Sequence, residues 1–203
     1  MQMMNRNEQA DRAYIAVSRQ IQELEKIRGT GEEKALLANL RRAAGKSPAE
    51  VPEVWGAILS NLDTEEPSRR SLTPEENATF LALTLYAIAS QGRDSKGHEV
   101  QQNGISLGKA AGLVVRKDAE KLKSMQSRMK SVLASRYYPE IGVKLRTLIP
   151  LLTADSGLDF PMLAKDLVFL SDPHTKSRVA IFWARGFVNA MNSGKKTEGE
   201  TAE

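Results

Sequence analysis

The sequence predicts an all-α protein made of two small helical bundles joined by a mobile loop. Apolar residues recur every three to four positions along most of the 203 residues, which is the spacing of one face of a helix. Helix-capping signatures stand before several of these stretches, at Ser47–Glu50 (SPAE) and Thr73–Glu76 (TPEE). No stretch shows sustained alternation of β-branched residues between turn signals, so no sheet is expected.

Four helices are expected in the N-terminal bundle, residues 1–97. The first covers about residues 9–28, and the second runs from about residue 32 until Gly45 ends it. A short third helix follows the cap at Ser47. The fourth is apolar almost all round over residues 80–89, and a helix of this kind lies in the centre of a core rather than at its surface.

A glycine- and charge-rich segment, residues 91–104, is typical of a mobile loop and marks the domain boundary. Residues 98–192 are then expected to form a second, basic bundle of four or five helices. Its helices are predicted to begin after Ser106, near Asp118, after Pro139, at Asp159 and at Asp172. The tail, residues 193–203, has almost no apolar residue and is expected to be disordered.

The composition excludes several classes of enzyme. The chain has no cysteine, so it offers no disulfide, no thiolate metal site and no thiol nucleophile. Its two histidines, His98 and His174, lie far apart and lack ligand-spaced neighbours. No glycine-rich phosphate motif is present, and the acidic pair Glu75 and Glu76 is explained by the first turn of a helix. We therefore expect no catalytic residues, no metal and no cofactor.

No segment is predicted to cross a membrane. No apolar run approaches the roughly 20 residues that span a bilayer, and residues 1–12 are polar where a signal peptide would be apolar. We expect a cytoplasmic protein without a membrane partner.

The charge is unevenly distributed along the chain. Residues 1–103 hold 13 Lys and Arg against 15 Asp and Glu, whereas residues 104–192 hold 14 against 7. Within residues 105–146 there are ten basic residues and three acidic ones. Such a field attracts polyanions, and nucleic acid is the commonest polyanion of the cytoplasm. A solvated charged face, or a face for an acidic protein, is the alternative interpretation.

The aromatic residues are few, at 5% of the chain, and five of them fit apolar helix stripes: Trp55, Phe80, Phe182, Trp183 and Phe187. Because residues of the core cannot stack on bases, we expect contact with the nucleic-acid backbone rather than base stacking.

Several short segments resemble, in their order and spacing, the CasB family. They are Leu40–Lys46, Phe80–Ile88, Ile105–Lys109, Leu158–Leu167 and Phe182–Arg185. The resemblance covers about residues 10–190. It implies an all-helical, non-catalytic small subunit of the type I-E CRISPR Cascade complex, present as a pair of copies beside the other Cascade subunits. It also implies binding of guide RNA, target strand and displaced DNA strand without sequence preference.

Guide pairing would supply the sequence specificity of such a complex, so a shallow basic surface is enough for the protein. Ten residues are the predicted contacts, with Arg128 and Arg41 first: Arg41, Arg42, Lys46, Arg93, Lys109, Arg128, Lys130, Arg136, Lys144 and Arg146. The competing hypothesis is a helical adaptor that docks its basic half on an acidic protein.

Overall fold

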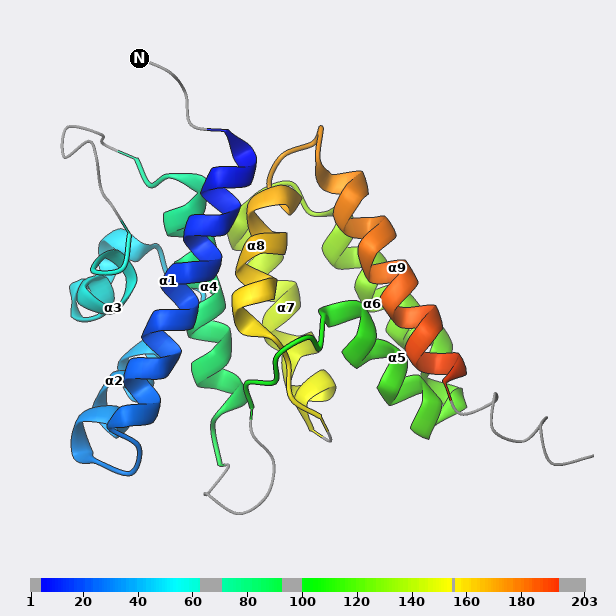
Figure 1. The fold of residues 1–203 in the computed structure, drawn as a ribbon, viewed down its shortest axis with the longest axis horizontal. Helices are drawn as coiled ribbons and strands as arrows, with labels where there is room; N and C mark the ends of the chain where they lie inside the picture. The colour runs from blue at the N-terminus through cyan, green and yellow to red at the C-terminus, as the bar shows by residue number, and fades with distance from the viewer. Residues whose placement is uncertain (1–4, 63–70, 93–99, 155, 194–203) are drawn as a thin grey trace, which may run out of the picture.

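The computed structural model describes residues 5–62, 71–92, 100–154 and 156–193. These residues are helical, as predicted, and the only β-type pairing among them is one isolated parallel bridge between Gln101 and Leu158. The α-helices are α1 (Arg6–Lys26), α2 (Gly31–Ala43), α3 (Trp55–Leu59), α4 (Pro74–Ala89), α5 (Leu107–Lys117), α6 (Leu122–Ala134), α7 (Tyr138–Thr153), α8 (Phe160–Leu170) and α9 (Lys176–Asn192). Figure 1 shows α2 and α3 at one end of the molecule and α5 and α9 at the other.

The predicted caps are formed. Thr73 and Glu76 make a capping box at the start of α4, Ser106 caps α5, and Asp159 caps α8. Several starts differ from the sequence prediction: α1 begins at Arg6, about three residues earlier, and α6 begins at Leu122, after a short 3-10 turn that follows Asp118. The segment after Ser47 consists of two short 3-10 turns before α3, because each turn begins at a proline, Pro48 or Pro52. The last helix begins at Lys176, four residues later than predicted.

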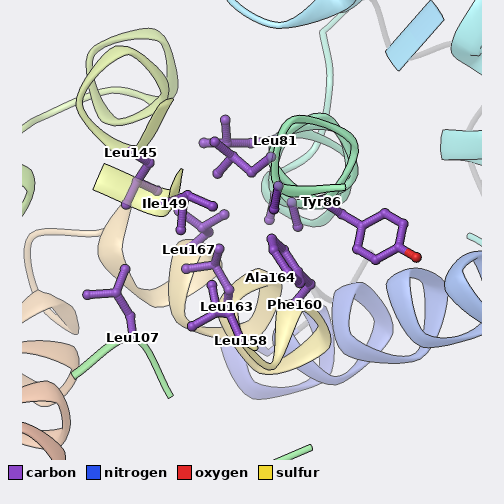
Figure 2. Close-up of a cluster of buried hydrophobic side chains, with 14 of the residues drawn as sticks. Leu81, Tyr86, Leu107, Leu145, Ile149, Leu158, Phe160, Leu163, Ala164 and Leu167 are labelled. Atoms are coloured by element: carbon purple, nitrogen blue, oxygen red, sulfur yellow. The ribbon is translucent and has the colours of Figure 1, made fainter. Parts of the chain in front are cut away.

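Helix α4 lies in the centre of the fold, as its sequence predicts. Almost every residue from Ala78 to Ala89 is buried, and α1, α2, α3, α7 and α8 pack against it. The core beside it combines residues from α4, α5, α7 and α8, among them Leu81, Leu107, Ile149 and Phe160 (Figure 2). The Tyr86 and Phe160 rings meet edge to face, with centroids 5.4 Å apart.

This core draws on both sides of the boundary expected near residue 98. Residues 93–99, the centre of the expected loop, lie outside the described residues. The following segment differs from a mobile loop, since Leu158 N–H donates to Val100 O at 2.9 Å and Gly104 N–H donates to Asp159 Oδ2 at 2.7 Å. The division into two domains stays a prediction.

The expected core aromatics divide into two groups. Phe80, Trp183 and Phe187 are buried, as predicted. The prediction was wrong for Trp55 and Phe182, which are 46% and 43% exposed. Each lies on a helix whose other face already fills the core.

Helices α5 and α9 form the most extensive helix pair, and they approach so closely because α5 carries glycines where the two helices meet. A Cβ atom added to Gly108 would lie 2.0 Å from the backbone oxygen of Trp183, and one added to Gly112 would lie 2.3 Å from that of Phe187. Both neighbours are backbone atoms, so neither can turn aside.

A buried carboxyl group joins α8 to α9. The Trp183 indole N–H donates to Asp166 Oδ2 at 2.6 Å, and both side chains are buried. Burial raises the pKa of Asp166 to about 7, which the nearby Asp159 reinforces, while the Trp183 hydrogen bond and Lys165 act in the opposite direction.

We predict that Gly108→Ala lowers the free energy of unfolding by about 3 kcal/mol, because the helices must separate to admit one methyl group. Gly56→Ala in α3 is the matched control, since nothing lies within 4 Å of its added Cβ. It should be neutral or stabilising by up to about 1 kcal/mol. Urea unfolding measures both, and equal effects would contradict the close approach.

We predict that the contribution of Asp166 to stability falls as the pH rises from about 4 to about 7, because the folded chain holds a proton on Asp166 that the unfolded chain releases. Asp166→Asn keeps an acceptor for Trp183 and removes the buried charge. It should raise the free energy of unfolding at pH 8 by roughly 2 kcal/mol and have little effect at pH 4. Unfolding at both pH values tests this, with the exposed Glu53→Gln as control; a pH-independent effect of Asp166→Asn would refute it.

Candidate nucleic-acid interface

Three of the predicted contact residues line one open depression. Arg41 and Arg42 come from the last turn of α2, and Arg146 comes from the middle of α7. Together with Ala38, Ala44 and Gln91 they line a depression of about 730 Å³. The sequence predicted all three arginines as contacts but contained no signal that Arg146 meets Arg41 and Arg42.

Local contacts hold two of these arginines in place. Arg41 Nη1 donates to Ala87 O in α4 at 3.4 Å, and Arg146 Nη1 donates to Ala44 O at 3.3 Å. Gly45 turns the chain beside them with φ +87°, a left-handed conformation that most residues avoid. A Cβ added to Gly45 would lie 3.5 Å from Arg146 Nη1, so the turn and the guanidinium are direct neighbours.

The guanidinium groups keep most of their hydrogen-bonding capacity. A guanidinium has five N–H donors, and Arg41 and Arg146 each use one on a carbonyl. Arg42 donates through Nη2 to Asn39 Oδ1. Within the described ranges, none of the three forms an ion pair with Asp or Glu. The remaining donors suit the bidentate recognition of a phosphate.

A second basic surface lies on α6. Arg128 and Lys130 are exposed there, and neither has a hydrogen-bond or ion-pair partner in the described part of the chain. Lys46, after α2, and Arg136, before α7, are exposed as well. The backbone N–H of Arg136 donates to Glu140 Oε2 at 2.9 Å, and this hydrogen bond leaves the Arg136 side chain free to reach a ligand.

Lys144 is engaged inside the protein. Its Nζ donates to Glu140 Oε1 at 2.6 Å, to Ser135 Oγ at 2.9 Å and to Ser131 O at 3.0 Å. An ammonium group has three donors, so none is left for a phosphate. The hydrogen bond from Lys144 also lowers the pKa of Glu140. This lysine joins α7 to the end of α6.

The two other predicted residues are less informative. Lys109 is half-buried, and its Nζ lies 3.5 Å from Gly104 O. Arg93 lies outside the described residues. Two exposed arginines on α9, Arg178 and Arg185, were not among the predicted contacts. The sequence feature that distinguishes them is the absence of any Asp or Glu from residues 176–192.

The described residues show neither a metal site nor a membrane span. Among the residues that the structure describes, no group of three His, Asp or Glu side chains could hold a metal ion. His174 is exposed and uses its backbone N–H on Asp172 Oδ1. In the described part of the chain, none of the helices has the length and apolar character that crossing a bilayer requires.

Fold and surface together define an all-helical protein with an arginine-lined depression. The chain belongs to the CRISPR-associated protein Cse2 family, whose model matches residues 36–187. The matched span contains all ten predicted contact residues. The comparison with curated proteins gives no match.

Two solved structures share this fold. CasB from Thermobifida fusca is 29% identical, with a TM-score of 0.72 over 86% of this chain and 97% of that one. CasB from Thermus thermophilus is 24% identical, with a TM-score of 0.64 over 86% and 98% of the two chains. The family model and the first of these structures confirm the resemblance to CasB seen in the sequence.

We predict that the basic residues separate into structural and binding groups. Lys144→Gln should lower the free energy of unfolding by about 1 kcal/mol, because the link between α6 and α7 is broken, and should leave nucleic-acid affinity unchanged. Lys130→Gln removes no partner and should change stability by less than about 0.5 kcal/mol. It should weaken binding instead. Thermal unfolding and fluorescence anisotropy measure the two properties, and the reverse pattern would contradict the assignment.

Proposed function

We propose that the chain is the non-catalytic small subunit of a cytoplasmic type I-E CRISPR Cascade surveillance complex. It binds nucleic-acid backbone without sequence preference and stabilises guide RNA, target strand and displaced strand in the R-loop. Its protein partners are the other Cascade subunits and a second copy of itself. It needs neither a cofactor nor a membrane.

The observation that carries this proposal is the arginine-lined depression. Ala44 and Arg146 are 102 residues apart in the sequence, yet the Arg146 side chain reaches the end of α2 and joins Arg41 and Arg42. Like charges repel one another, so a cluster of arginines without acidic partners among the described residues favours an anionic ligand. The depression is open and shallow, which suits a backbone rather than an enclosed small molecule.

Backbone contact also agrees with what such a complex requires of its proteins. Base pairing with the guide reads the target sequence, and the protein needs only to hold sugar and phosphate. Arginine and lysine at the surface provide this through charge, without regard to the bases.

We predict that Arg41→Ala combined with Arg146→Ala weakens binding to unrelated sequences about equally. Removing one phosphate-binding side chain should flatten the slope of log affinity against log salt by about 0.9 for duplex DNA. The double variant should therefore reduce the slope by up to about 1.8. Arg128→Ala combined with Lys130→Ala should behave in the same way, and fluorescence anisotropy over a salt series measures both.

The matched control is Arg19→Ala combined with Lys34→Ala. It removes the same charge from positions of α1 and α2 outside the predicted contact set, and it should change the slope little. Weaker binding to one sequence alone would mean that the protein reads bases. If the wild-type chain shows no salt-dependent binding but binds an acidic protein, the adaptor hypothesis replaces the proposal.

A further inference from the structure

The outer face of α9 exposes apolar side chains that the core does not need. Ile181, Phe182 and Val188 are about half exposed, at 52%, 43% and 47%. The inner face of the same helix fills the core with Val179, Trp183, Phe187 and Ala190. A group of exposed apolar side chains on one face of a packed helix is a candidate interaction surface.

Phe182 lies between two arginines. Arg178 precedes it by four residues and Arg185 follows it by three, so the three side chains are neighbours on one side of the helix. Both arginines are exposed. The Arg178 guanidinium carbon lies 4.9 Å from the centre of the Phe169 ring, which fixes its side chain over α8. The two arginines are about 10 Å apart along the helix axis, with the phenyl ring between them.

The surrounding helices are cationic. Helices α5, α6 and α9 contain nine Lys and Arg residues and no Asp or Glu. The only acidic residue within α8, which also packs against α9, is Asp166, and it is buried against Trp183. An anion that approaches the outer face of α9 therefore meets no exposed carboxylate from these four helices.

We propose that this face binds single-stranded nucleic acid, with an unpaired base stacked on Phe182 and phosphates held by Arg178 and Arg185. The inference rests on the proposed function and adds a second site to it, with a different ligand chemistry. The arginine-lined depression contacts backbone alone, whereas this face has an aromatic platform. A duplex buries its base faces in the stack, so only an unpaired strand can use the ring.

The surroundings of the other exposed aromatic support the choice of ligand. Trp55 has nearly the same exposure as Phe182, but the exposed residues near it in the chain include Glu50 and Glu53, and its indole N–H donates to Pro48 O at 2.7 Å. Carboxylates repel a phosphate backbone. Trp55 is therefore the matched control for Phe182.

The test compares three fluorescent probes of equal length: a single DNA strand, its duplex, and an abasic strand that keeps the phosphates. Phe182→Ala and Phe182→Leu should weaken binding to the base-bearing strand by roughly tenfold, since a stacked base strengthens binding by about that factor. Binding to the duplex and to the abasic strand should stay within about twofold. Phe182→Tyr keeps the ring and should bind as the wild type does, as should Trp55→Ala.

The salt dependence of binding should distinguish the contribution of charge from that of base stacking. Arg185→Gln should flatten the salt slope for the single strand by about 0.7, whereas Phe182→Leu should leave the slope unchanged. Circular dichroism checks that the variants are folded.

Three results would overturn the site. In the first, Phe182→Leu binds the base-bearing strand with wild-type affinity, while Arg41→Ala combined with Arg146→Ala binds it more weakly. This result would refute the stacking site and leave the proposed function unaffected. Another is that Phe182→Leu weakens binding to the abasic strand as much as binding to the base-bearing strand, which would mean that no base stacks on the ring. The third is a change in sedimentation of Phe182→Ala with unchanged strand binding, which would make the face an interface between proteins.

Discussion

The burial of α4 on every side determines how the rest of the chain is arranged. A helix with no polar face must be covered all round, and α1, α2, α3, α7 and α8 provide that cover. This requirement brings the end of α2 close to the middle of α7. Arg41 then reaches a carbonyl of α4, and Arg146 reaches a carbonyl that follows α2. The arginine-lined depression is thus a consequence of covering one apolar helix.

Positive charge serves two purposes in this protein, and only three-dimensional structure distinguishes them. Lys144 uses all three of its donors on neighbouring groups of the protein. Arg128 and Lys130 have no partner in the described ranges and face water. Moving a cation whose donors are all engaged onto a ligand would break the hydrogen bonds it already makes, whereas a cation with free donors only displaces counterions from the nucleic acid. Cations that keep free donors are therefore the better contacts for a polyanion.

Local signals in the sequence predicted the helices, their caps and the central place of α4, because each depends on residues within a few turns. The burial of Trp55 and Phe182 was predicted wrongly, since helical spacing does not say which of two apolar stripes faces the core. The role of Lys144 depends on Glu140 one turn away but also on Ser131 and Ser135 at the end of the preceding helix. The depression depends on packing between residues 102 apart, which no local pattern encodes.

The close approach of α5 and α9 has a consequence for how this surface can evolve. Backbone meets backbone at Gly108 and Gly112, so these two positions accept essentially one amino acid. The outward positions of α9 carry no such restriction, and most surface substitutions there change stability little. The side chains on the outer face of α9 can be substituted during evolution while the packing of α5 against α9 stays the same. The ligand preference of this end of the molecule can therefore change with little effect on folding.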